Sequence, residues 1–283
     1  MRKRNHVSAI ETGGGPPVIE SLARGLRVLR CFTPATPSLT LQEIADELDI
    51  PKGSAFRVVS TLKQLGFLRQ DHASKQYRLG LRALDLGFTC LVGLEYPDTA
   101  LPKLEELAAE TKGSASMAIL DGADIVYVAR ASIQRVMSLN LSVGSRLPCY
   151  ATSMGQILLA HLEEGLLETL LDGLAFHPFT PFTTTGRQSL VARLQQIRVE
   201  GYAVSDQELE IGLTSAAAPV RDASGQVVAA INVSMVSAWA SNDNVKCEIV
   251  PKLLEAGHVI SRSLGYRPGV QRQSRSTANT TAG

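Results

Sequence analysis

Residues 51–66 carry basic and small polar side chains at spacings that one face of a helix would bring together. Arg57 can offer two parallel N–H groups to a guanine edge or to a phosphate. Lys52 and Lys63 are interpreted as phosphate contacts, which position a protein on a duplex without reading its sequence. We therefore predict that this helix enters the major groove of double-stranded DNA. The candidate contacts on it are Lys52, Ser54, Arg57, Ser60 and Lys63.

Local signals predict the elements that would hold this helix. Residues 40–43 (Thr-Leu-Gln-Glu) form a capping box at the start of the preceding helix, and Gly66 is a suitable C-terminal glycine for the DNA-facing helix. An earlier helix is expected over residues 21–32, and two short strands over 67–70 and 76–79. This order predicts a winged helix-turn-helix. Its further candidate DNA contacts are Arg24, Thr40 and Lys75.

Apolar spacing predicts which side of each helix is buried. In the first helix the expected stripe is Leu22, Leu26, Val28, Leu29 and Phe32. In the second it is Leu41, Ile44, Ala45 and Leu48, and in the third it is Ala55, Val58, Val59, Leu62 and Leu65.

The charge of the chain is divided unevenly. Residues 1–96 hold thirteen Lys and Arg against nine Asp and Glu, whereas the remainder holds fifteen against eighteen. A basic first third suits a phosphate-binding module that precedes a separate domain. The four cysteines form no CxxC pair and no cluster with histidine, so the sequence predicts no metal site and no cofactor, and it fits a reducing cytoplasm. No apolar run reaches the length of a membrane span, so we expect no membrane partner.

The second two thirds of the chain reads as an α+β domain. Strands are expected over 114–120, 125–131, 136–141, 202–206, 215–220 and 227–233, with residues 144–148 as a loop. Helices are expected over 99–111, 153–162, 163–171, 189–201 and 244–264. The predicted organisation is a disordered arm (1–17), a winged helix-turn-helix (18–80), a linker helix (81–96), the α+β domain (97–266) and a disordered tail (267–283).

Several segments resemble IclR-type transcriptional regulators over roughly residues 20–265. The segments that carry the resemblance are 21–26, 39–45, 65–68, 121–122, 125–130, 141–148, 151–155, 206–213 and 229–234. Residues 139–153 and 206–213 look most like the branch that controls catabolism of aromatic acids through the β-ketoadipate pathway. The resemblance implies a GAF-like effector-binding domain, dimers that pair into tetramers, and transcriptional control that could involve RNA polymerase.

The same resemblance implies a pocket for a small organic acid, which lies beside the start of the helix that begins at Ser153. A helix N-terminus offers free N–H groups to a carboxylate, and alternation puts Asn232 and Ser234 on one face of a strand. At residue 214 this chain has Thr where the family pattern often has Arg. The candidate effector contacts are Leu139, Leu147, Ser153, Met154, Asp206 or its neighbour Ser205, Leu213, Ser215, Asn232 and Ser234. Arg130, Arg135 and Arg146 either pair with an acid or are solvated surface charges.

Two other functions compete with a DNA-binding regulator. A hydrolase would need an activated nucleophile, but residues 152–155 are not a G-x-S-x-G elbow, and no histidine has a local acidic partner. No phosphate-binding or dinucleotide fingerprint appears either. The second alternative is a small-molecule sensor that acts through protein contacts alone, which promoter binding with a steep salt dependence would exclude.

Overall fold

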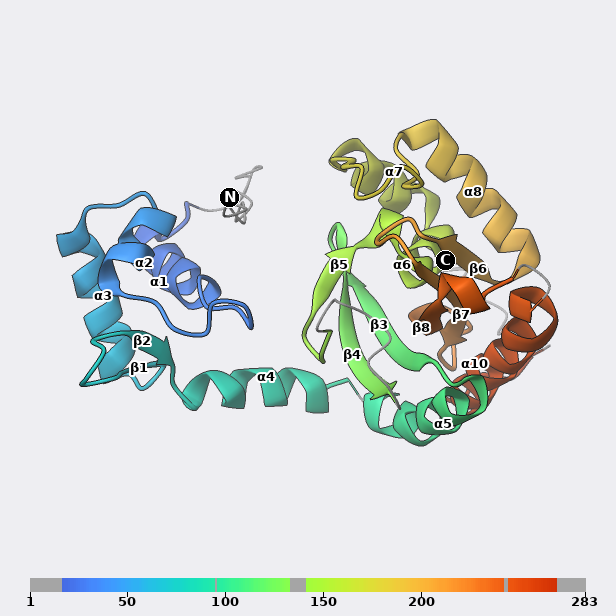
Figure 1. Ribbon diagram of the computed structural model, residues 1–283, viewed down its shortest axis with the longest axis horizontal. Coiled ribbons are helices and arrows are strands. Elements are labelled where there is room, and N and C mark those ends of the chain that lie inside the picture. Colours follow the sequence, from blue (N-terminus) through green and yellow to red (C-terminus); the bar gives the residue numbers. More distant parts are fainter. Residues whose placement is uncertain (1–16, 95, 133–140, 242–243, 269–283) are drawn as a thin grey trace, which may run out of the picture. The chain divides into compact units, whose positions relative to one another are not determined.

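The computed structural model describes residues 17–94, 96–132, 141–241 and 244–268. The chain divides into two compact units, Met1–Gly93 and Leu94–Gly283 (Figure 1). The predicted arm and tail lie outside the described residues, apart from residues 17, 267 and 268.

The first unit is a helix-turn-helix followed by a small hairpin. Its elements are α1 (Glu20–Arg30), α2 (Leu41–Glu47), α3 (Lys52–Gln64), β1 (Leu68–Gln70), β2 (Tyr77–Leu79) and α4 (Arg82–Val92). Strands β1 and β2 are antiparallel, with Arg69 opposite Arg78. The three helices and the hairpin share one apolar core, which includes Val28, Ile44 and Val59. This is the winged helix-turn-helix that the sequence predicts.

The start of α2 shows the predicted capping box. The backbone N–H of Glu43 donates to Thr40 Oγ1 at 3.2 Å, and the N–H of Thr40 donates to Glu43 Oε2 at 2.9 Å. Two donors that the helix cannot satisfy itself are thereby paired. At the end of α3, Gly66 has a φ of +80°, the left-handed conformation that glycine adopts without strain.

Three predicted buried positions are wrong. Leu22 and Leu26 are 61% and 55% exposed, because α1 buries Ala23 and Val28 instead and the leucines of its early turns project away from that side. Leu65 is 49% exposed because it lies just past the last turn of α3, where Leu62 and Leu68 fill the core.

The second unit is one antiparallel six-stranded sheet with helices on both faces. The strands are β3 (Ser114–Asp121), β4 (Asp124–Ser132), β5 (Arg146–Pro148), β6 (Ala203–Asp206), β7 (Leu213–Arg221) and β8 (Val227–Val236), in the order β5-β4-β3-β8-β7-β6. The helices are α5 (Tyr96–Thr111), α6 (Ser153–Ala160), α7 (Glu164–Asp172), α8 (Arg187–Glu200) and α10 (Val250–Ser263), which continues a π-helical turn over Val245–Ile249. Short 3-10 turns cover Cys149–Ala151 and Ser237–Trp239.

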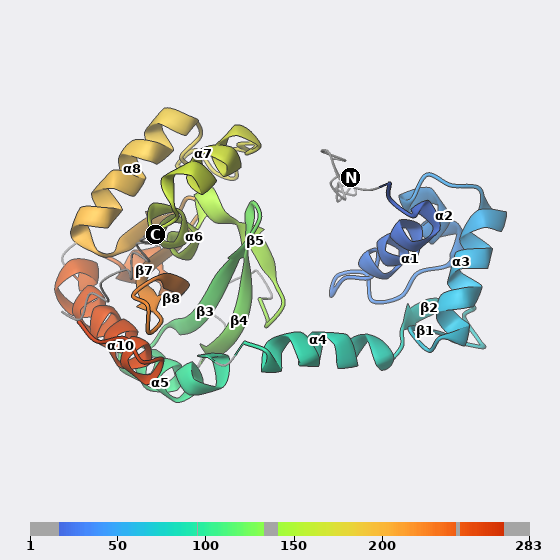
Figure 2. The same cartoon turned by 180° about the vertical axis from the view of Figure 1, so that it is seen from behind.

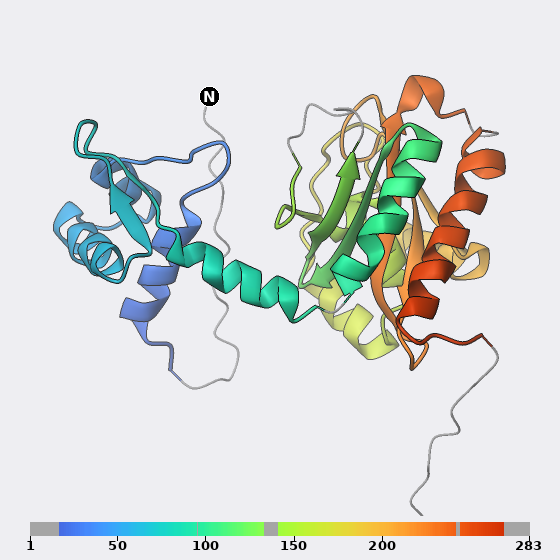
Figure 3. The same ribbon diagram turned by 90° about the horizontal axis from the view of Figure 1, so that it is seen from below.

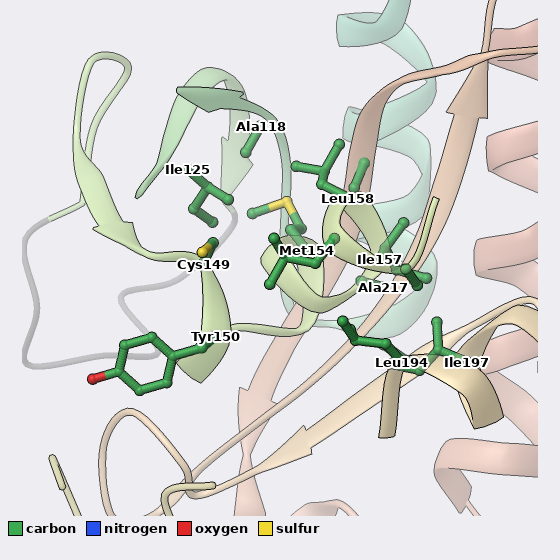
Figure 4. Packing of buried hydrophobic residues seen from close by; sticks show 14 of the residues in the cluster. Ala118, Ile125, Cys149, Tyr150, Met154, Ile157, Leu158, Leu194, Ile197 and Ala217 are labelled. Atoms are coloured by element: carbon green, nitrogen blue, oxygen red, sulfur yellow. The ribbon is translucent and has the colours of Figure 1, made fainter. Parts of the chain in front are cut away.

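The two faces of the sheet have different covers. Helices α5 and α10 lie side by side on one face, as Figures 2 and 3 show, and contact each other as well as β4 and β7. Helix α6 contacts β7 and β8 on the other face and packs against α8. Figure 4 shows Met154 and Ile157 of α6 among the buried side chains of this second layer, with Leu194 and Ile197 of α8.

Helix α6 begins very close to the preceding turn. A Cβ placed on Gly155 would lie 2.1 Å from the carbonyl oxygen of Cys149 and 2.4 Å from its Cα. Only glycine fits this approach. Thr152 caps the same helix by accepting the Gly155 N–H at 3.2 Å. The position of Ser153 is therefore fixed by backbone contacts.

One element prediction needs correction and another lies outside the described residues. Residues 146–148, predicted as loop, form strand β5 opposite Asp124–Val126 of β4, so their backbone groups are paired across the edge of the sheet. The strand predicted over 136–141 falls on residues 133–140, which are not described, apart from Leu141. Within the described ranges, no helix is both long and apolar enough to cross a membrane.

Candidate functional site

The structure places five candidate DNA contacts on α3. Ala55, Val59 and Leu62 bury one side of this helix, and Arg57 and Lys63 are exposed. Arg57 is about 200° around the helix from Ala55, so it lies opposite the buried stripe. Lys52 is also exposed, whereas Ser54 and Ser60 are partly buried. Phe56 is 54% exposed on this outward side, an unusual place for a large aromatic side chain.

The other three candidate DNA contacts lie on neighbouring elements. Lys75 is exposed in the turn between β1 and β2 and has a positive φ of 60°. Thr40 is occupied by the capping box. Arg24 is paired with Glu20 at 3.3 Å on α1, so a phosphate would have to compete with that carboxylate. The α3 residues therefore form the cluster, and these three flank it.

The second unit contains a pocket between the sheet and the start of α6. Strand β4 contributes Tyr127 to it, and the segment leading into α6 contributes Ala151, Thr152 and Ser153. Ser205 and Leu209 enter from β6 and the connection after it. Leu213 and Ser215 of β7 and Asn232 and Ser234 of β8 complete the lining. The free space is about 20 Å³, which holds about one water molecule.

Polar side chains in the pocket are hydrogen-bonded to one another. Ser153 Oγ lies 2.8 Å from Ser215 Oγ, which ties the start of α6 to β7. Asn232 Nδ2 donates to Ser234 Oγ at 3.0 Å. Asn232 Oδ1 is buried and has no hydrogen-bond partner among the residues that the structure describes. An unpaired buried acceptor is costly, so this oxygen offers a ligand hydroxyl a favourable position.

Burial also changes the acidity of the pocket wall. Desolvation raises the pKa of the Tyr127 phenol to about 12, and the neighbouring charge of Arg130 opposes part of that rise. Tyr127 is therefore a neutral hydrogen-bonding group at physiological pH.

Loop contacts hold the pocket wall that carries Leu209. Thr183 Oγ1 donates to the carbonyl of Glu208 at 2.6 Å. The Glu208 carboxylate accepts from Gln156 Nε2 of α6 at 3.2 Å and from the N–H of Thr184 at 3.2 Å. This buried network joins the β6–β7 connection to α6, so movement of one would be felt by the other.

Five of the predicted effector contacts meet at this pocket: Ser153, Leu213, Ser215, Asn232 and Ser234. Ser205, named as the alternative to Asp206, also lines it, whereas Asp206 accepts a hydrogen bond from Thr214 at 2.6 Å outside the lining.

Two predicted effector contacts, Met154 and Leu147, lie elsewhere. Met154 follows Ser153 by about 100° around α6, so its side chain packs in the core, and Leu147 packs against that same core. Leu139 lies outside the described residues.

Sequence reasoning missed Tyr127, Ala151, Thr152 and Leu209. Strand alternation over residues 125–131 predicts which residues share a face with Tyr127. A β-bulge in β4, opposite Met117 and Ala118, shifts that alternation. The Thr152 side chain could have been found as the helix cap. Leu209 carries no periodic signal, because it lies in an irregular connection.

A winged helix-turn-helix joined to an α+β domain with a polar buried pocket defines a ligand-responsive DNA-binding regulator. Residues 21–72 match the IclR helix-turn-helix domain, and residues 89–262 match the C-terminal domain of bacterial IclR transcriptional regulators. The chain belongs to the IclR family, so it is a transcriptional regulator and not an enzyme.

Individual relatives indicate which members of the IclR family this chain resembles. The chain is 38% identical to the Pca regulon regulatory protein of Pseudomonas putida over 252 residues, covering 89% of this chain and 86% of that one. It is 32% identical to the p-hydroxybenzoate hydroxylase transcriptional activator of Acinetobacter baylyi, covering 76% and 80%. An IclR homologue of Microbacterium hydrocarbonoxydans, solved with 4-hydroxybenzoate, superposes with a TM-score of 0.76 at 27% identity, covering 86% and 98%.

Proposed function

We propose that this regulator controls an operon for aromatic-acid catabolism and that its pocket binds a small aromatic acid. The observation that carries the proposal is the pocket itself, where buried serine and asparagine groups face apolar leucines and no described group pairs with Asn232 Oδ1. Polar groups of this kind fix the orientation of a ligand whose ring fills an apolar space. The relatives named for the Pca regulon and for p-hydroxybenzoate hydroxylase support the same ligand class.

The pocket must open to admit such a ligand. Its free space holds about one water, whereas a ring with a carboxylate needs several times more. The contacts that would part are the Ser153–Ser215 hydroxyl pair and the packing of Leu209 and Leu213. Ligand binding therefore couples to the position of α6, and this movement is the proposed signal.

In this proposal α3 contacts DNA. Arg57 binds a base edge or a phosphate, and Lys52 and Lys63 bind phosphates. Winged helix-turn-helix proteins bind as dimers on paired half-sites, and we infer that this cytoplasmic chain forms dimers or tetramers. The support for this is α4, which has no buried residue and exposes Leu84, Phe88 and Val92. The ligand signal would change either the affinity for DNA or the contact with RNA polymerase.

Thermal denaturation of the full chain tests the ligand class. We expect 4-hydroxybenzoate or 3,4-dihydroxybenzoate to raise the melting temperature, with about 2.7 kcal/mol of added stability at a hundredfold excess over Kd. The neutral 4-hydroxybenzyl alcohol, which lacks the carboxylate, is the matched control and should raise the melting temperature less than the acids do. If none of the acids changes the melting temperature, the proposed effector class is wrong.

Binding of a promoter fragment tests the DNA role separately. Affinity should fall steeply as salt rises, because each neutralised phosphate releases a counterion. A chain that senses an acid but shows no such binding would act through protein contacts alone.

A further inference from the structure

The face of the sheet beneath the pocket carries a continuous row of serines. Ser114 of β3 is opposite Ser132 of β4 and Ser234 of β8, and the row continues to β7 and β6 through Ser215 and Ser205. Residues directly opposite each other in antiparallel strands share a face of the sheet. The hydroxyls that line the pocket are therefore one end of a longer polar row.

A second row runs beside the first and ends in a cation. Ser116 of β3 is opposite Asn232 of β8 and opposite Arg130 of β4. The Arg130 guanidinium donates to Ser116 Oγ at 3.2 Å and to Ser114 Oγ at 3.3 Å. The guanidinium therefore lies over β3, where Ser116 is directly opposite Asn232 of β8.

The β-bulge in β4 explains how an arginine reaches this face. Tyr127 pairs with Ala118, but Ala129 pairs with Met117, so Val128 is the extra residue. Residues 127 and 130 would face opposite sides of a regular strand. The bulge brings both to the pocket side, and bulges are common where a strand must re-aim a side chain.

Arg130 has no carboxylate partner among the described residues. The exposed Arg146 pairs with Asp121 and Asp124, and Arg187 pairs with Glu168 and Asp172. Arg130 is more buried than either, and its burial lowers the pKa of the guanidinium, which shows the cost of removing it from water. Its described partners are two neutral hydroxyls. A half-buried guanidinium whose described partners are neutral hydroxyls is well suited to bind an anion.

We propose that Arg130, assisted by Ser114 and Ser116, binds the carboxylate of the effector at the β3 end of the polar row. This inference rests on the proposed function and specifies how the acid is recognised. Arg130 lies outside the present lining, so the bound state extends the cavity past Asn232 toward β3.

Strand spacing sets the size of the ligand. Adjacent strands are about 4.8 Å apart, so the guanidinium over β3 and the Ser153–Ser215 pair at β7 are about 10 Å apart. Subtracting two hydrogen bonds of about 2.9 Å each leaves about 4 Å in the closed pocket. A benzene ring with a second polar group across from its acid is longer than this, so the opening of the pocket must also separate these two ends, and Asn232 Oδ1 lies between them.

Calorimetric titration of full-length variants with 4-hydroxybenzoate and 3,4-dihydroxybenzoate tests this assignment. We expect Arg130→Gln to weaken binding of the acid about 10- to 100-fold, the loss typical of a charged hydrogen bond. Arg130→Lys should retain part of the affinity, because it keeps the charge but not the fork. The matched control is Arg262→Gln, which removes an exposed arginine on α10.

A neutral probe and promoter binding separate this role from a folding defect. Arg130→Gln should bind 4-hydroxybenzyl alcohol as the wild type does and should keep its affinity for a promoter fragment in the absence of acid. Equal affinity of wild type and Arg130→Gln for the acid would overturn the inference and leave the proposed function intact. If the acids do not bind the wild type, both fail. If Arg130→Gln no longer binds 4-hydroxybenzyl alcohol, the role of Arg130 is structural and the inference fails.

Discussion

The two candidate sites of this chain are built in opposite ways. The DNA-facing side of α3 is exposed, and its residues come from one continuous segment of thirteen residues. The effector pocket is buried, and its lining comes from β4, α6, β6, β7, β8 and the connections between them. A local site needs only a well-formed helix on a core, whereas a dispersed site depends on the register of a whole sheet.

This difference predicts where the chain tolerates substitution. Exposed residues on α3 can change with little effect on folding, because surface positions away from special features contribute little to stability. The pocket residues cannot be separated so easily from folding, because Ser153 and Asn232 are nearly fully buried within the sheet and its helix layer. Substitutions at the two sites therefore need different controls.

The largest effect is expected where α6 meets the turn before it. Gly155→Ala places a methyl group inside the contact distance of the Cys149 backbone, so we expect a loss of about 3 kcal/mol or more in the free energy of unfolding. Denaturant unfolding of the full chain measures it. Gly165→Ala is the matched control, because its Cβ would meet nothing within 4 Å on α7 and alanine favours a helix. A Gly155→Ala chain as stable as the wild type would show that backbone contacts do not fix the start of α6.

A smaller effect is expected at the capping box. Thr40→Ala removes the acceptor for the Glu43 N–H, which should cost about 1 kcal/mol of stability. Thr40→Ser keeps the hydroxyl and should restore most of it. Promoter affinity measured well below the melting temperature then reports whether Thr40 also touches DNA. Stability that is the same in all three chains would contradict the capping role.

The smallest effect is a pH dependence in the second unit. Burial lowers the pKa of His161 below its usual 6.5, and the charges of Arg221 and Arg198 act in the same direction, against a hydrogen bond to the Ile157 carbonyl. The unfolded chain therefore takes up this proton first. The stability that His161 contributes is complete above 6.5 and is lost as pH falls through the lower folded value.

Unfolding at several pH values measures that contribution. We expect His161→Gln to show a flatter decline in the free energy of unfolding between about pH 7 and pH 5 than the wild type. His72 lies exposed in the wing, so His72→Gln is the control that should keep the wild-type slope. An identical slope in His161→Gln would rule out this source of acid sensitivity.

The sequence predicted the first unit well because its signals are local. The Thr40–Glu43 box and the helical spacing of Ala55, Val59 and Leu62 each lie within one or two turns. The errors at Leu22 and Leu26 arise because α1 buries Ala23 and Val28 instead, and the error at Leu65 arises because this residue lies just past the end of α3. Spacing indicates which side is apolar, but not how much of that side is covered.

The pocket was harder to predict because contacts across the sheet decide it. The family resemblance implies Ser153, Ser215, Asn232 and Ser234, and strand alternation adds that Asn232 and Ser234 share one face. No spacing rule, however, places Arg130 beside Ser116, fourteen residues away, because a bulge changes the register between them. The resemblance also implies Met154, yet one residue past Ser153 along α6 this side chain is turned into the core.

The central claim is that DNA contact and acid sensing reside in separate units of one chain. Fluorescence anisotropy with a labelled promoter fragment, paired with melting in 4-hydroxybenzoate, tests it on Arg57→Ala. We expect Arg57→Ala to lose about 1–3 kcal/mol in binding to the promoter and to show the same acid-induced rise in melting temperature as the wild type. Unchanged promoter affinity, or loss of the response to acid, would contradict it.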